Sequence, residues 1–193
     1  MDTFRQLEVL SDEQLVEHAN RGDAQSPAAF ETLYRRHRDT VLRLARRYTR
    51  GDEALALDAA QETFIYLLGK FPPPPENQLT LTAKLTTFLF PVARHAALSA
   101  TKKKARLRLT TGDALPEPIA ESPIPLDDGL DALLGRLSDE HCEVVLLRFV
   151  DDMTVPEIAR ALDIPQGTVK SRLHHAVAQL RRDPATKKYF ELP

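Results

Sequence analysis

The chain has 193 residues, of which 42% are hydrophobic and 28% are charged, and its formal net charge at pH 7 is −2. This length suits one or two domains, and the hydrophobic content is enough for small helical cores. The sequence shows no signal peptide, membrane-spanning run, metal-ligand pattern, phosphate-binding loop or nucleophile elbow, so we expect a cytoplasmic protein that is not an enzyme, needs no cofactor or metal and does not insert into membranes.

Two helices are predicted near the N-terminus. Ser11 can cap the first helix, with Gln14 placed to complete a capping box, and this helix ends at about residue 20. The second helix is predicted to start at Ser26, as the cap, with Pro27 at the first helical position.

A third helix is predicted over about residues 52–70, because Gly51 ends the second helix and a proline run at 72–75 stops the third. Its apolar residues recur at helical spacing and predict a buried stripe. That stripe consists of Leu57, Phe64, Leu67 and Leu68.

The fourth predicted helix starts between residues 82 and 87 and continues to about residue 105. Pro91 lies within it, so the helix is expected either to start late or to kink there. Phe88 and Phe90 share a helical spacing with apolar neighbours, which favours core positions for both rings over a role in stacking on bases.

An acidic, proline-rich stretch divides the chain. Residues 110–131 contain six acidic residues, four prolines and no basic residue, which is typical of an extended tether. No segment shows sustained strand alternation. The sequence therefore predicts an all-α protein with two small helical domains, residues 1–108 and 129–193, joined by a flexible linker at 109–128.

Four more helices are predicted near residues 127–135, 139–149, 156–162 and 166–182. The second of these contains the only cysteine, Cys142, which is expected to be buried. The last two helices are predicted to form a helix-turn-helix motif, with Thr154 and Glu157 as a capping box and Pro165 and Gly167 in the turn.

The last helix has an apolar side and a polar, basic side. Val169, Leu173, Val177 and Leu180 predict the buried side. A basic side of this kind is typical of a helix that lies in a DNA major groove, and the alternative is a structural helical hairpin.

Two segments of the chain together resemble bacterial sigma factors. The sequence GTVKSRLHHA at residues 167–176 resembles the promoter-binding C-terminal domain of the extracytoplasmic-function (ECF) group. The sequence DAAQETFIYLL at residues 58–68 resembles the family's helix that docks on core RNA polymerase. Because the two motifs occur in the right order and at a plausible separation, the chain is identified as a member of this family over residues 11–182.

The resemblance implies a contact with core RNA polymerase and two contacts with promoter DNA. The expected residues facing the clamp of the largest polymerase subunit are Asp58, Gln61, Glu62 and Phe64. The fourth helix and the loop at residues 72–82 are expected to capture a flipped base of the −10 element, with contacts from Lys84, Arg94, His95, Lys102, Lys103 and Lys104. The expected −35 contacts are Thr168, Lys170, Ser171, His174 and His175, together with Arg172 nearer the phosphates.

The chain departs from the family pattern in the fourth helix. ECF proteins commonly have Trp-Leu near Phe88, Arg-Asn near Arg94 and an Asp near Ser99, and the Trp, Asn and Asp are missing here. These departures concern the −10 base preference and admit a decoy that binds an anti-sigma protein without initiating transcription. An ordinary helix-turn-helix regulator is a further alternative. For a sigma factor, the implied partners are core RNA polymerase, promoter DNA and an anti-sigma factor.

Overall fold

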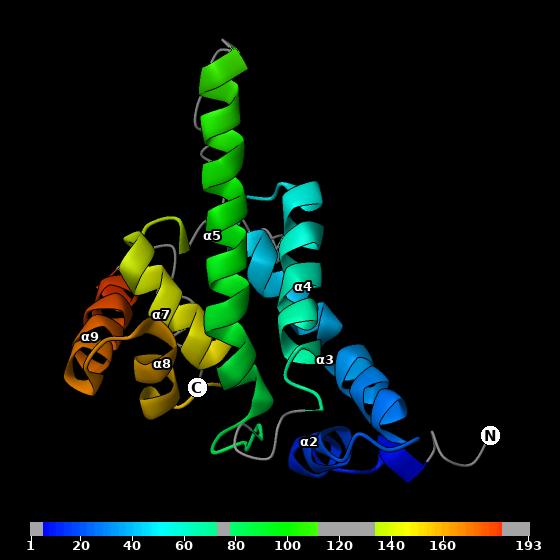
Figure 1. The fold of residues 1–193 in the computed structure, drawn as a ribbon. Coiled ribbons are helices and arrows are strands. Elements are labelled where there is room, and N and C mark those ends of the chain that lie inside the picture. The colour runs from blue at the N-terminus through cyan, green and yellow to red at the C-terminus, as the bar shows by residue number, and fades with distance from the viewer. Residues whose placement is uncertain (1–5, 73–77, 112–133, 183–193) are drawn as a thin grey trace. The chain divides into compact units, whose positions relative to one another are not determined.

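The structure, a computed structural model, describes residues 6–72, 78–111 and 134–182. All regular elements in these ranges are helices, which confirms the all-α prediction (Figure 1). The described residues fall into two compact units, one within residues 1–119 and one within 120–193. The predicted linker at 109–128 and the helix predicted near 127–135 lie mostly outside the described residues. None of the helices in the described ranges is long and apolar enough to cross a bilayer.

The first two main helices are joined by a tight turn. Helix α2, Asp12–Asn20, begins with the predicted capping box at Ser11. Helix α3, Ser26–Tyr48, begins differently from the prediction, because Ser26 is its first residue and not its cap. The Asp23 carboxylate accepts the backbone N–H of Ser26 at 3.1 Å, while the Ser26 hydroxyl donates to the His18 carbonyl at 2.8 Å and ties α3 to the end of α2.

Helix α4, Glu53–Leu68, buries a different face from the predicted one. Phe64 and Leu67 are buried as predicted, but Leu57 and Leu68 are 51% and 49% exposed. Small side chains occupy the positions facing the core and let α4 pack closely on α3 and α5. These are Ala56, Ala59 and Thr63.

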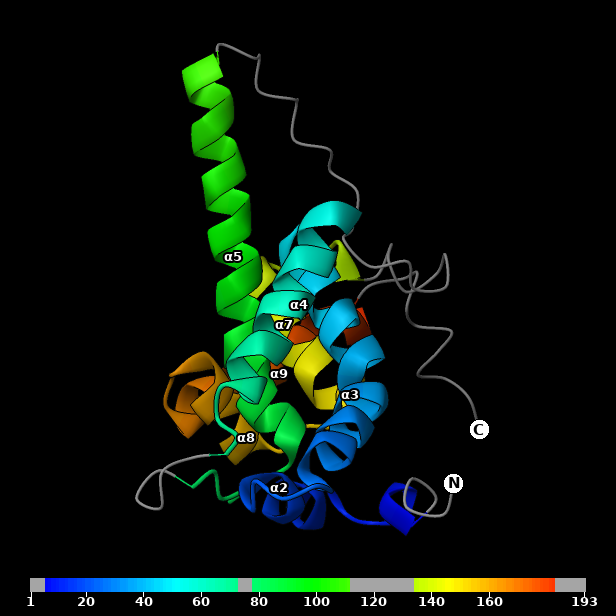
Figure 2. The ribbon, with the colours of Figure 1, turned by 45° about the vertical axis from the view of Figure 1, so that its right-hand side comes forward.

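Helix α5, Leu85–Thr111, starts within the predicted interval and continues through Pro91, which lies on its exposed side. It extends beyond the predicted end at residue 105, because the residues that follow favour helix and the first breaker is Gly112. Figures 1 and 2 both show the C-terminal part of α5 running past the ends of α3 and α4. The prediction that Phe90 belongs in the core is confirmed, whereas Phe88 is only partly buried.

The C-terminal unit contains α7, Asp139–Phe149, α8, Val155–Leu162, and α9, Gln166–Arg182, each within one residue of its predicted bounds. The predicted capping box of α8 is confirmed, since the Glu157 carboxylate accepts the Thr154 backbone N–H at 2.7 Å. The turn is shorter than predicted: Asp163 takes the left-handed conformation at φ 54°, and Gly167 already belongs to the first turn of α9.

The core of this unit lies along α9. Val169 is fully buried as predicted, and so is Ala176, which the apolar stripe did not include. Leu173 and Leu180 are partly buried against the same cluster. Cys142 also lies beside it but is only partly buried, in contrast to the prediction of a buried thiol.

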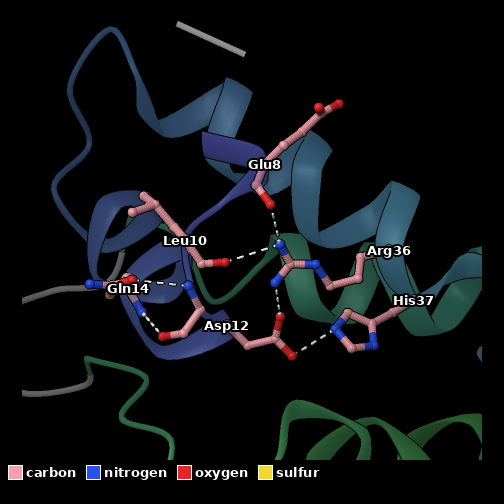
Figure 3. A network of polar contacts seen from close by, with 7 residues as sticks. Glu8, Leu10, Asp12, Gln14, Arg36 and His37 are labelled. Atoms are coloured by element: carbon pink, nitrogen blue, oxygen red, sulfur yellow. Dashed lines mark hydrogen bonds and ion pairs between the residues drawn. The ribbon is translucent and has the colours of Figure 1, made fainter. Parts of the chain in front are cut away.

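A polar network holds the N-terminal segment and α2 on α3 (Figure 3). The Asp12 carboxylate accepts from Arg36 Nη1 at 2.6 Å, and its other oxygen lies 2.8 Å from His37 Nε2. Arg36 Nη2 also donates to the carbonyls of Glu8 and Leu10. Burial raises the pKa of Asp12, but the hydrogen bonds and positive charge of His37 and Arg36 outweigh burial and hold that pKa below its ordinary value.

Replacement of this carboxylate, Asp12→Asn, is expected to lower the free energy of unfolding at pH 7 by about 2 kcal/mol, the usual worth of charge-assisted hydrogen bonds. Because the folded-state pKa of Asp12 is lowered, its contribution is complete above the unfolded-state value and is lost as pH falls below about 4. Urea titrations at several pH values should therefore show the two proteins converging in acid. The exposed carboxylate of Asp39, changed to Asn, serves as the control, and an equal loss there would contradict the role of the network.

Candidate nucleic-acid and polymerase interfaces

The outer face of α4 carries three of the four residues predicted to contact polymerase. Asp58, Gln61 and Glu62 are all exposed on this helix. Phe64, the fourth, is only 7% exposed, and its ring packs edge-on against Tyr34 of α3 with 4.8 Å between centroids. Phe64 therefore holds α3 and α4 together and does not lie on the surface.

Exposed apolar side chains accompany these polar groups. Leu57, Ile65 and Leu68 are 51%, 60% and 49% exposed. Ile65 lies two turns after Leu57, and Leu68 lies one turn after Ile65, so all three are on the side of the helix that also carries Gln61. This feature is not evident from the apolar spacing of the sequence, which placed Leu57 and Leu68 in the core. Clustered exposed apolar residues beside charged groups are typical of surfaces that bind a partner. We call these six residues the α4 outer face.

The predicted −10 contacts do not form one cluster. They run from Lys84, before α5, to the far part of that helix, which at 1.5 Å per residue separates the two ends by about 30 Å. Lys104 pairs with Asp52, the cap of α4, and the Arg94 guanidinium lies 5.5 Å from the centre of the Tyr48 ring. The others on α5 are exposed on one side of the helix: His95, Lys102 and Lys103.

The segment before α5 presents polar groups in a regular pattern. Of the predicted loop at residues 72–82, positions 73–77 lie outside the described residues. Residues 78–84 lie in no helix, and exposure alternates along them. Leu79 and Leu81 pack against the core, while the exposed positions are Gln78, Thr80, Thr82 and Lys84. Amides, hydroxyls and an ammonium group of this kind suit hydrogen bonding to bases and phosphates.

Most of the predicted −35 contacts lie on the outer side of α9. Lys170, Ser171, His174 and His175 are exposed, and Thr168 is partly exposed. The His175 ring stacks on His141 of α7 with 6.3 Å between centroids and meets the His174 ring edge-on.

Arg172, the remaining predicted −35 contact, pairs within the C-terminal unit. Its Nη2 forms an ion pair of 2.8 Å with the Glu140 carboxylate of α7, and its side chain is 22% exposed. Arg172 thus joins α9 to α7. The guanidinium that was predicted to contact DNA is paired with a carboxylate within the unit.

Two family profiles match the chain. The profile described as sigma-70 region 2 matches residues 33–107, and the profile described as sigma-70, region 4, matches residues 133–182. In the region 2 match lie α4, most of α5 and the segment between them, and in the region 4 match lie α7, α8 and α9.

Solved structures share the fold. CnrH, solved in complex with the cytosolic domain of CnrY, superposes with a TM-score of 0.57 at 22% identity and covers 86% of this chain and 92% of its own. The sigma factor RpoE of Bartonella quintana, solved with the anti-sigma factor NepR, gives a TM-score of 0.54 at 21% identity and covers 77% and 94%.

Curated relatives are closer in sequence. The ECF RNA polymerase sigma factor SigL of Mycobacterium tuberculosis is 34% identical over 165 residues, which cover 82% of this chain and 90% of that protein. SigW of Bacillus subtilis, with the same description, is 26% identical and covers 86% of this chain and 93% of its own length. The chain therefore belongs to the ECF RNA polymerase sigma factors, with a region 2 domain followed by a region 4 domain.

Proposed function

We propose that this ECF sigma factor binds core RNA polymerase through the α4 outer face and reads promoter DNA with two further surfaces. In this proposal residues 1–108 bind polymerase and open the −10 element, and residues 129–193 read the −35 element. The observation that carries it is the exposure, on α4, before and along α5, and on α9, of separate polar surfaces inside the matched family regions. The protein supplies recognition in the bacterial cytoplasm, while polymerase performs the catalysis.

The composition of the α4 outer face explains how it could bind. Asp58 and Glu62 would steer a basic polymerase surface during encounter. Leu57, Ile65 and Leu68 would then supply the apolar area that keeps the complex together, at about 25 cal/mol per Å² removed from water. An anti-sigma protein, such as the NepR partner of the related RpoE structure, would compete with polymerase if it covered the same face.

Run-off transcription tests the proposal directly. Purified core polymerase is incubated with genomic fragments of the source organism, with and without this protein, and discrete transcripts are expected only when it is present. Core binding without any specific transcript would contradict promoter recognition. Absence of core binding, together with capture of an anti-sigma protein, would instead identify a decoy.

The −35 surface makes a further prediction at His175. The substitution His175→Arg is expected to tighten holoenzyme binding to a promoter fragment several-fold, because a guanidinium can bind guanine in two places and adds a charge that meets DNA. The salt dependence of log Kd should steepen by about one counterion, and His175→Ala should change affinity little. Fluorescence anisotropy at several salt concentrations measures both. Val150→Arg, which adds the same charge at the end of α7, is the control, and an equal gain there would remove His175 from the reading surface.

A further inference from the structure

The register of the segment at residues 78–84 depends on contacts from outside it. Its backbone belongs to no helix, so successive side chains are held by what they touch. Leu79 and Leu81 occupy the inward positions against the core of the unit. If the segment shifted by one residue, these leucines would face outward and the polar side chains would be turned toward the core.

Asn20, the last residue of α2, fixes this segment from 59 positions away in the sequence. Its Nδ2 donates to the backbone carbonyl of Leu79 at 3.0 Å. Its Oδ1 is buried and has no hydrogen-bond partner among the residues that the structure describes. The bond joins the end of α2 to the backbone of the segment, so it fixes the position of Leu79 relative to the rest of the unit.

The same end of α2 also contacts the other side of the loop. Gly22 follows α2 with a φ of +66°, and a Cβ built on it would lie 3.0 Å from Pro72 Cβ. Phe71, before this proline, packs edge-on against Phe30 of α3, with 6.4 Å between ring centroids. The turn after α2 thus lies against Pro72, and the last residue of α2 bonds to Leu79.

We infer that Asn20 is a positioning residue for promoter reading: its hydrogen bond to Leu79 sets the register in which Gln78, Thr80 and Thr82 face outward to meet the bases of the single-stranded −10 element. This inference rests on the proposed function, and it adds a residue from α2 that touches no DNA itself. Base discrimination requires polar groups at fixed positions, because a bidentate or paired hydrogen bond tolerates little displacement. Substitution of Asn20 therefore leaves Gln78, Thr80 and Thr82 present but less firmly held in position.

The test measures discrimination between bases by the holoenzyme. Full-length protein is combined with core polymerase and titrated with single-stranded non-template oligonucleotides that cover the −10 element of a promoter found by run-off transcription. One base is replaced at a time. Wild-type holoenzyme is expected to lose about tenfold in affinity for a replacement at a read position. With Asn20→Leu the ratio should fall below about threefold, while affinity for core polymerase stays unchanged.

Two further variants distinguish a positioning role of Asn20 from a role in folding. Asn20→Ala, compatible with a helix end, should reproduce the loss of discrimination. Both Asn20 variants lose a single hydrogen bond, worth about 1 kcal/mol, so both should remain folded at the temperature of the titration. Glu17→Gln, at an exposed position of the same helix, should keep the full ratio. A purely structural role would lower affinity for all oligonucleotides equally and leave the ratio intact.

The outcomes distinguish this inference from the proposed function. If Asn20→Leu keeps full discrimination while the double variant Gln78→Ala and Thr80→Ala loses it, the role of Asn20 is overturned and the proposed function stands. Full discrimination in both overturns the assignment of −10 reading to this segment. Loss in both, with the control unaffected, supports the inference.

Discussion

Reversal of two charges on α4, Asp58→Arg with Glu62→Arg, should reduce the affinity for core RNA polymerase at least about 100-fold, since each like-charge contact at an interface costs several kcal/mol. Both side chains are exposed and lie one turn apart, so the two arginines would meet the partner together. The melting temperature should change little, because the face of α4 that packs in the core is unaltered. Co-purification and titration in moderate salt measure the two quantities.

A matched control uses the same charge change on another helix. Glu13 and Glu17 are exposed acids with the same spacing on α2, and Glu13→Arg with Glu17→Arg should leave polymerase binding nearly intact. If the two double variants bind equally well, α4 is not the contact. If both lose binding equally, the effect is one of net charge and the α4 outer face has no special role.

The α4 outer face also shows where sequence reasoning is incomplete. The pattern of apolar residues correctly predicted a helix here, but it assigned Leu57 and Leu68 to the core. Which side of an apolar helix is buried depends on its neighbours, and here α3 and α5 pack against Ala56 and Ala59. Leu57 and Leu68 therefore lie on the surface. Hydrophobicity alone does not show whether a leucine packs in the core or is exposed to contact a partner.

Helix boundaries were best predicted where the signal is local. The capping box of Thr154 and Glu157 lies within four residues, and α8 begins where it predicted. The end of α5 was placed too early, because no stop signal marks residue 105 and the charged residues after it favour helix. At Ser26 a long-range bond to the His18 carbonyl replaced the expected cap.

Basic residues were the least predictable part of the candidate sites. The predicted DNA contacts of Lys104 and Arg172 stay predictions, and in the structure each side chain pairs with an acid from another part of its own unit, Asp52 and Glu140. A positive charge in the sequence does not reveal whether its partner is a phosphate or a distant carboxylate. The bond between Asn20 and Leu79 could not be foreseen either, because neither residue belongs to a recognisable local motif.

The C-terminal unit has a small core and should be sensitive to the loss of one large side chain. Leu147 is fully buried, together with Val144, Met153 and Ile158. Leu147→Ala should lower the free energy of unfolding of this unit by about 3 kcal/mol through lost burial and the cavity left behind. A core of this size supplies only about 3–5 kcal/mol in total, so about 0–2 kcal/mol would remain and a measurable fraction of the unit should be unfolded at 37 °C.

Hydrogen exchange followed by mass spectrometry can locate this loss. Amide protons of α7, α8 and α9 should lose protection in Leu147→Ala, while those of α3 and α4 keep it, because the two units are separate cores. Affinity for a −35 duplex should fall in proportion to the folded fraction of the unit, and polymerase binding through α4 should remain. Leu107→Ala makes the same chemical change at a residue that is 65% exposed and should alter none of these quantities. Loss of protection in both units would mean that the chain unfolds as one cooperative body. It would contradict the assignment of −10 and −35 recognition to two separate domains.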